Sequence, residues 1–251
     1  MKIEEVKPYK DQSEKSKRDQ IEEMFDNIAS GYDDLNHNMS LGVDSHWRQY
    51  VIDYLEMGGA WPSRILDVAT GTGDLALLAA VRLEPDEVIG IDISEEMMKI
   101  GREKVEAAGL GDAIKFQNED CAHMSFADKS FDAVVSAFAL RNFEDLQQCL
   151  NEMYRVLEPG GTIAVIDLCN PKHFPMKQLF AIYQKFIMPL VSRRFIGDKE
   201  AASYLNDTMK VVPSGKDMAR LFEQAGFQNV NYRALQFGMC YLYTGIKEAN
   251  N

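Results

Sequence analysis

The stretch Ile65-Leu-Asp-Val-Ala-Thr-Gly-Thr-Gly-Asp-Leu-Ala76 decides the fold that the sequence predicts. Its first four residues are mostly apolar and indicate a short buried strand. Gly71 and Gly73 then permit a tight turn, and a run of strong helix formers begins at Asp74. A glycine turn between a strand and a helix exposes unpaired N–H groups and lets a ligand approach the backbone closely. The stretch therefore predicts a nucleotide-binding turn, with a ligand-free turn as the alternative.

Asp67 distinguishes this turn from one that binds a dinucleotide. The spacing of Gly71, Gly73 and Ala76 also fits the dinucleotide fingerprint G-x-G-x-x-G/A, so the glycines alone are a weak signal. Asp67 lies inside the strand, where a pyrophosphate has no use for a carboxylate but the ammonium group of a methionine-derived ligand does. The pattern D-x-x-x-G-x-G, followed by an acidic end of the next strand, resembles the S-adenosylmethionine (SAM) site of class I methyltransferases.

Polar residues also follow other predicted strands at the point where each strand ends. We predict parallel strands at residues 65–68, 87–92, 114–117, 131–136 and 162–168. Asp92 ends the second of these, where an acidic residue accepts hydrogen bonds from a ribose diol. Asp120 and Cys121 come soon after the third strand, and residues 137–142 follow the fourth. Because ligands of open α/β sheets bind beyond the carboxyl ends of the strands, Asp67, Asp92, Asp120 and residues 137–142 are all expected to face one crevice.

The rest of the chain predicts helices around this sheet and two closing strands, at residues 230–235 and 239–246. The predicted fold class is α/β: a Rossmann-like class I SAM-dependent methyltransferase sheet, mostly parallel with a C-terminal antiparallel hairpin, and helices on both faces. We expect one domain over residues 1–251, with an N-terminal helical segment at 18–55 and a helical cover inserted at about 171–210.

Two N-terminal segments carry little apolar pattern. Residues 1–17 are polar and charged, and we expect a frayed lead. Residues 32–40 gather Tyr, Asp, Asn and His between two predicted helices. We expect a capped, solvated loop there, with the edge of a lid over the cofactor as the alternative.

Composition excludes several classes of protein. The net charge is −12, from 27 basic and 39 acidic side chains, which argues against a nucleic-acid partner. The four cysteines form no CxxC pair, so we expect reduced thiols and a cytoplasmic protein. The four histidines show no metal-ligand spacing, so no metal is expected. The charged N-terminus is unlike a signal peptide, and no apolar run approaches the roughly 20 residues of a membrane-spanning helix.

A more specific resemblance covers nearly the whole chain from about Met24. The motifs that carry it are Met24-Phe-Asp-Asn-Ile-Ala-Ser-Gly-Tyr-Asp-Asp-Leu-Asn36, Phe138-Ala-Leu-Arg-Asn142, Arg155-Val-Leu-Glu-Pro-Gly-Gly161 and Ala225-Gly-Phe227. Together they resemble the UbiE/MenG/Coq5 family of quinone C-methyltransferases. The resemblance implies C-methylation of the ring of a prenylated hydroquinone, as in the conversion of demethylmenaquinol to menaquinol.

The same resemblance implies which residues contact SAM. Gly71, Gly73 and Asp67 belong to the glycine turn, and the residues implied to touch SAM are Thr72, Asp92, Asp120 and Cys121. The family commonly has Asn-Ala-Glu where this chain has Asp120-Cys121-Ala122, so the contacts on the adenine side are expected to differ in detail.

The chemistry needs a group that favours loss of the acceptor's phenolic proton, because a phenol has a pKa of about 10. Arg141 follows the fourth strand and is the cation predicted to stabilise a phenolate, with a helix cap or surface salt bridge as the alternative. Tyr32, Asp33 and His37 are predicted to orient the quinol or relay its proton. Two other functions stay open: another SAM-dependent small-molecule methyltransferase, acting on a ubiquinone-precursor benzoquinol or on an O-methyl or lipid-type acceptor, and a SAM-binding regulatory protein without catalysis.

Residues 174–195 mix large apolar side chains with four basic ones, Lys177, Lys185, Arg193 and Arg194. A prenylated quinol lies in a bilayer, so this segment is predicted to line a tunnel for the tail or to contact the membrane surface. A helix packed on the sheet is the alternative. Peripheral contact would place the protein at the inner face of the membrane, and a homodimer is left open.

Overall fold

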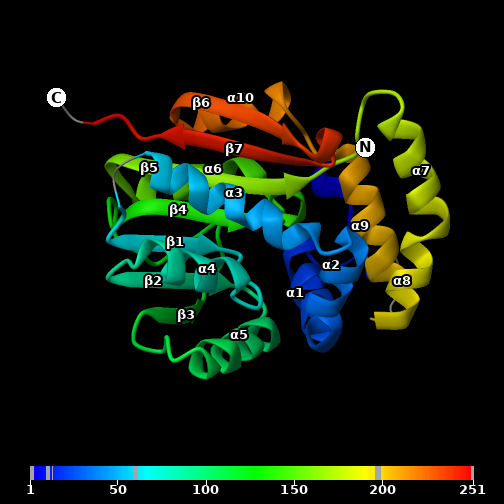
Figure 1. The fold of residues 1–251 in the computed structure, drawn as a ribbon, viewed down its shortest axis with the longest axis horizontal. Coiled ribbons are helices and arrows are strands. Elements are labelled where there is room, and N and C mark those ends of the chain that lie inside the picture. Colours follow the sequence, from blue (N-terminus) through cyan, green and yellow to red (C-terminus); the bar gives the residue numbers. More distant parts are fainter. Residues whose placement is uncertain (1–2, 10–11, 13, 59–60, 196–198, 250–251) are drawn as a thin grey trace.

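The computed structural model describes residues 3–9, 12, 14–58, 61–195 and 199–249. Its centre is a seven-stranded sheet in the order β3-β2-β1-β4-β5-β7-β6 (Figure 1). Strands β1 to β5 are parallel, and β7 runs antiparallel to its neighbours β5 and β6. The strands are β1 (Arg64–Val68), β2 (Glu87–Asp92), β3 (Ile114–Asn118), β4 (Phe131–Ala137), β5 (Leu157–Leu168), β6 (Gln228–Leu235) and β7 (Cys240–Ile246). The predicted fold class is confirmed.

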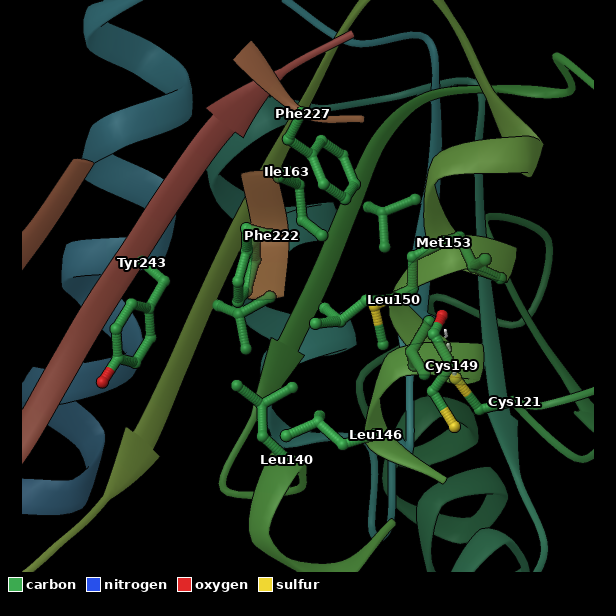
Figure 2. Packing of buried hydrophobic residues seen from close by; sticks show 14 of the residues in the cluster. Cys121, Leu140, Leu146, Cys149, Leu150, Met153, Ile163, Phe222, Phe227 and Tyr243 are labelled. Atoms are coloured by element: carbon green, nitrogen blue, oxygen red, sulfur yellow. Dashed lines mark hydrogen bonds between the residues drawn. The ribbon is translucent and has the colours of Figure 1, made fainter. Parts of the chain in front are cut away.

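Helices cover both faces of the sheet and bury a core on each. One face carries α3 (Val43–Met57), α4 (Asp74–Leu83) and α5 (Glu95–Ala107), whose apolar residues pack on β1, β2 and β4. The other face carries α6 (Leu146–Val156) and α10 (Lys216–Ala225). Figure 2 shows Leu150 and Met153 of α6 and Phe222 of α10 packed around Ile163 of β5. Because β1 and β4 are buried on both faces, these strands read as apolar runs in the sequence.

The predicted glycine turn joins β1 to α4. Gly71 and Gly73 have φ values of +56° and +78°, a region that favours glycine. A Cβ atom on Gly73 would lie 2.8 Å from Cζ of Phe116, so the turn packs tightly against the side chain of β3. Asp67 and Asp92 lie on the neighbouring strands β1 and β2 and therefore reach the same edge of the sheet.

The N-terminal lead is packed where the structure describes it, so the expectation of a frayed segment over residues 1–17 is wrong for that part. Ile3, Val6 and Tyr9 are buried. Lys17 holds this segment against the rest of the protein. Its side chain is fully buried, and its Nζ donates hydrogen bonds to the backbone oxygens of Ile3 and Phe143. A buried ammonium group needs such acceptors, and these bonds tie the lead to the loop after β4.

The expected solvated loop at residues 32–40 is also wrong, because this segment forms helix α2 (Tyr32–Ser40). It comes after α1 (Lys17–Ile28) and ends at Ser40, and the next residue, Leu41, has a left-handed φ of +54°. Leu35 is the buried residue of α2, and Tyr183 donates a hydrogen bond to the Met39 oxygen at 2.6 Å. Tertiary contacts therefore hold a helix for which the polar sequence offers little apolar pattern.

The segment expected as a helical cover consists of α7 (Met176–Phe186), α8 (Met188–Phe195) and α9 (Lys199–Val211). These helices stand beside α1 and α2, next to the carboxyl ends of the parallel strands (Figure 1). Ala201 and Tyr204 of α9 join Met24 and Ile28 of α1 in a third core cluster. In contrast, α7 has no buried residue. Among the described residues, no helix has the length and apolar character needed to cross a membrane.

Candidate functional site

A cavity of about 500 Å³ opens at the carboxyl ends of β1, β2 and β4. It is closed on one side by α1, and its size is that of sites for small ligands. The residues of the strand ends and turns that line it are Ala69, Gly71, Asp92, Asp120, Cys121, Ala137 and Phe138, and those of α1 are Arg18, Ile21 and Phe25. The crevice expected from the sequence is therefore present, and it brings Gly71, Asp92, Asp120 and Cys121 together.

Asp92 is held by the glycine turn. Its Oδ2 accepts a hydrogen bond from the Gly71 N–H at 2.8 Å, and its Oδ1 accepts one from the Ser94 N–H at 2.9 Å. Desolvation nevertheless raises the pKa of Asp92 to about 6. A partly desolvated carboxylate in a fixed orientation suits a ligand that donates two hydroxyl groups, as a ribose does.

Asp67 lines a smaller cavity that adjoins the large one at Gly71 and Phe138. Its Oδ2 accepts from the Thr70 hydroxyl at 2.7 Å, whereas the buried Oδ1 has no hydrogen-bond partner. Burial raises the pKa of Asp67 to about 7, and the charge of Asp92 adds to this effect. A cation such as an ammonium group would supply the missing partner and restore the charged form, so these residues fit the amino-acid end of SAM.

Arg48 of α3 lines the same small cavity, and sequence reasoning missed it. It forms ion pairs with Asp44 at 2.7 Å and with Asp74 at 3.2 Å, and its guanidinium lies 5.2 Å from the ring centroid of Phe138. An arginine in a predicted helix most often faces solvent, so the only available signal was its place beside Trp47. The cavity thus contains a buried carboxylate, Asp67, and a buried cation, Arg48, that is itself paired with two carboxylates.

Thr72 and Asp33 contact each other at the rim of the glycine turn. The Thr72 hydroxyl donates to Asp33 Oδ1 at 2.6 Å, and Lys104 Nζ lies 2.6 Å from Asp33 Oδ2. Asp33 therefore braces the turn, and it lines none of the cavities described here. Thr72 lines the small cavity beside Gly71.

Asp120 and Cys121 lie at the other end of the large cavity. Asp120 Oδ2 accepts from Arg18 Nε at 3.1 Å, and Oδ1 accepts from the Ala122 N–H at 2.9 Å. Cys121 is buried, and burial raises the pKa of its thiol well above the usual range. All four cysteines of the chain are free and buried. This end of the cavity is bounded by Arg18, a contact that the sequence pattern did not indicate.

A second cavity, of about 350 Å³, shares Phe138 with the first. Its wall is largely apolar and comes from α2, α3, α7, α8, α9 and the segments at the strand ends: Met39, Leu41, Val43, Trp47, Phe138, Leu168, Met176, Leu179, Phe180, Tyr183, Met188, Leu205, Met209 and Met239. Arg141 and Asn36 are among its polar residues. Phe138 lines this cavity and both of the others, so the three cavities adjoin one residue.

Arg141 lies at this second cavity and is buried. Its guanidinium forms an ion pair with the equally buried Asp167 of β5, and its backbone N–H donates to the same carboxylate at 2.8 Å. The alternative of a surface salt bridge is therefore wrong, since the pair is internal. Asp167 was missed, although an acidic residue inside an apolar strand was a visible signal.

Tyr32 and His37 are placed differently from each other. Tyr32 lines the large and the small cavity, and burial raises its pKa, while the Asn36 side chain and the charges of Arg141 and Arg48 act in the opposite direction. The His37 side chain is 69% exposed, 3.8 Å from Asp44, and it lines neither the apolar cavity nor the two on the cofactor side. Of these two, only Tyr32 is placed to act on a bound ligand. The described residues contain no cluster of three His, Cys, Asp or Glu side chains that could hold a metal ion.

Comparison with known proteins adds the evolutionary context. Residues 12–247 match the model of the ubiE/COQ5 methyltransferase family. A demethylmenaquinone methyltransferase of Bacteroides fragilis is 49% identical over 244 residues, which cover 97% of this chain and 98% of that protein. A demethylmenaquinone methyltransferase of Porphyromonas gingivalis is 41% identical over 245 residues, with 97% and 98% covered.

Solved structures give the same fold at much lower identity. A SAM-dependent methyltransferase of Thermotoga maritima, described as a "possible histamine N-methyltransferase", superposes with a TM-score of 0.62 at 17% identity. The match covers 91% of this chain and 100% of that one. At this identity the likeness supports the fold alone.

Proposed function

This chain belongs to the ubiE/COQ5 methyltransferase family, and we propose that it transfers a methyl group from SAM to a ring carbon of a prenylated hydroquinone. The proposed acceptor is demethylmenaquinol and the product menaquinol, because the relatives from B. fragilis and P. gingivalis bear the matching name and align over nearly their whole length. The observation that carries the proposal is that Phe138 lines both the large cavity, which contains Asp92 and Asp120, and the apolar cavity, which contains Arg141.

The large cavity and the small cavity beside it would hold SAM. Asp92 accepts hydrogen bonds from the ribose, while Asp67 and Arg48 receive the ammonium and carboxylate groups of the methionine end. Asp120 and Cys121 border the adenine end, and Thr72 lines the methionine end next to Gly71. SAM bound there supplies an electrophilic methyl group, so the main task of the protein is to position the acceptor in line with it.

The apolar cavity would hold the acceptor ring. A flat, apolar quinol ring fits a wall of Met, Leu and aromatic side chains, and Arg141 is the buried cation next to that ring. Asp167 holds the guanidinium of Arg141 in place. A fixed positive charge favours the phenolate over the phenol, and an ionised ring oxygen makes the neighbouring ring carbon nucleophilic. Tyr32, at the cofactor side, is placed to orient the acceptor from the other direction.

In this proposal, the prenyl tail leaves the apolar cavity along helices α7 and α8. Leu179 lines the cavity and is 55% exposed, and four further apolar side chains on these helices or between them are exposed: Ile182, Phe186, Ile187 and Leu190. Lys177, Lys185 and Arg194 accompany them, whereas the side chain of Arg193 lies outside the described residues. An exposed apolar face with basic residues suits contact with an anionic membrane surface, from which the substrate would enter.

The function is tested by incubating the purified protein with SAM and demethylmenaquinol under reducing conditions and detecting methylated product by mass spectrometry. Parallel reactions with a demethylated benzoquinol and with a catechol separate the proposed acceptor from other quinols and from O-methylation. We expect C-methylated naphthoquinol as the main product. Methylation of the catechol oxygen alone, or no turnover of any quinol, would overturn the proposal.

A further inference from the structure

A third cavity, of about 30 Å³, adjoins the apolar cavity and is surrounded by α1, α2, α8, α9 and the turn that carries Arg141. The two cavities share Asn36, Met39, Arg141, Met188 and Leu205, so the small one is a recess of the larger. Its volume is that of about one water molecule or one hydroxyl oxygen. We call it the recess.

Three residues that line the recess each have a buried polar atom without a hydrogen-bond partner: Asn36 Nδ2, Arg141 Nε and the Tyr204 hydroxyl. Tyr32 lines the recess as well; burial raises its pKa, and the neighbouring Asn36 side chain opposes this shift. Arg141 and Tyr204 are only 5% and 3% exposed. Each unpartnered buried polar group costs about 1–3 kcal/mol, so three around one space are unusual in a stable protein. They come from α2, from the turn after β4 and from α9, which lie far apart in the sequence.

The chemistry of these atoms restricts what can satisfy them. The guanidinium N–H of Arg141 and the amide of Asn36 are donors, and a tyrosine hydroxyl can donate as well. Burial raises the pKa of Tyr204, so its hydroxyl keeps its proton near neutral pH. The charged groups that act on it are Arg141 and Asp167. The complement of three donors is a small acceptor, ideally an oxygen that carries negative charge.

We propose that the recess binds the ionised ring oxygen of the acceptor, and that Tyr204 and Asn36 donate hydrogen bonds to it together with Arg141. This inference rests on the proposed function and extends it to Asn36 and Tyr204, neither of which was among the predicted site residues. The acceptor loses its phenolic proton to water before it enters the recess, and the phenolate that binds is stabilised there by three donors in an apolar surrounding. Met24, Met39 and Leu205 keep water from competing for them.

Binding of 1-naphthol tests the inference without turnover, because the naphtholate absorbs at longer wavelength than the neutral form. The protein is saturated with S-adenosylhomocysteine, and the ionised fraction of bound 1-naphthol is followed against pH. The wild type is expected to lower the apparent pKa of the probe. Tyr204→Phe and Asn36→Leu should each lower the ionisation constant of the bound probe by at least about tenfold, the effect of losing one hydrogen bond to a charged oxygen.

Tyr243→Phe is the matched control. Tyr243 is buried on β7, its hydroxyl accepts from the Gly215 N–H at 2.9 Å, and it lines none of the cavities described above. This variant should bind naphtholate like the wild type, and thermal unfolding of all variants checks that they are folded. If Tyr204→Phe and Asn36→Leu ionise the probe as well as the control does, the recess holds only water and the inference is wrong.

Turnover separates this inference from the proposed function. With demethylmenaquinol, the acidic limb of the pH profile of kcat should move to higher pH in Tyr204→Phe, while SAM affinity is retained. If the wild type fails to methylate the quinol but still favours the ionised form of 1-naphthol in a way that depends on Tyr204, the proposed substrate is wrong, and the recess does bind an ionised ring oxygen. If quinol turnover is found but Tyr204→Phe leaves its pH profile unchanged, the proposed substrate is correct and the proposed role of Tyr204 is wrong.

Discussion

The guanidinium of Arg141 and the carboxylate of Asp167 form an ion pair that is buried at the carboxyl ends of β4 and β5. The same carboxylate accepts the backbone N–H of Arg141, so one acidic side chain fixes both the turn and the cation that it carries. A buried arginine held in this way keeps its charge and its direction without rearranging during a reaction.

Arg141 should therefore act in turnover more than in SAM binding. Arg141→Gln removes the charge and should lower kcat by about 100-fold, the typical effect of losing a charge-stabilising donor. SAM affinity should stay close to that of the wild type, because Arg141 does not line the large cavity. Steady-state kinetics and calorimetry with SAM check both parts.

Arg48→Gln is the matched control, since Arg48 is also buried and paired with carboxylates but lines the small cavity beside Asp67. This variant should show the reverse pattern, with weakened SAM binding. If Arg141→Gln loses SAM affinity as steeply as it loses turnover, Arg141 belongs to the cofactor site.

Asp92→Ala should weaken SAM binding by about 1.5–3 kcal/mol, the value of hydrogen bonds to a charged group. The loss combines the ribose contacts with the support that Asp92 gives to the Gly71 N–H. Isothermal titration calorimetry measures the effect, and Asp112→Ala, at an exposed position, provides the control. Unchanged affinity in a folded Asp92→Ala protein would remove Asp92 from the site.

The affinity for SAM should rise with pH. Asp67 and Asp92 have pKa values of about 7 and about 6 in the ligand-free protein, and the positively charged ligand favours their ionised forms. Binding near pH 6 should therefore release protons, and affinity should increase from about pH 5 to pH 7 and then level off. Calorimetry in two buffers of different ionisation enthalpy counts the protons, and Asp67→Asn should release fewer.

The same shifts predict how the stability of the ligand-free protein depends on pH. Both folded-state pKa values lie above the ordinary value of 3.8, so protonation favours the folded state. This contribution is fully present below about pH 4 and is lost as the pH rises to about 7. In Asp67→Asn the loss of stability over that range should be smaller, as measured by thermal unfolding. An identical pH dependence in the variant and the wild type would contradict the shift of Asp67.

Contact with a membrane should depend on α7 and α8. Wild-type protein is expected to float with anionic liposomes, and less so at high salt, because a few basic side chains give only weak attachment. Phe186→Asp combined with Ile187→Asp should abolish flotation and lower activity on a long-tailed quinol more than on a short-tailed one. Both side chains are exposed, so the fold should survive.

Trp61→Asp combined with Val81→Asp is the control, since these side chains are also exposed and lie outside α7 and α8. It carries the same added charge and should float like the wild type. Equal losses of activity on both quinols, with flotation unchanged in the α7–α8 variant, would assign that segment to packing alone.

The sequence by itself determined the secondary-structure elements that depend only on residues adjacent in the chain. The strand, glycine turn and helix around Gly71 follow from apolar runs and backbone freedom, which are properties of a few adjacent residues. Because parallel strands present their carboxyl ends at one edge, Asp67, Asp92 and Asp120 could be placed in one region without coordinates.

Tertiary structure alone decided which side chains meet across elements that are distant in sequence. The polar residues 32–40 become a helix through contacts with α7 and α8, and Arg48 reaches the cavity of Asp67 from the middle of α3. The recess gathers Asn36, Arg141 and Tyr204 from three separate elements. Such groupings are set by how helices pack on the sheet, and packing depends on long-range contacts that leave no periodic pattern in the chain.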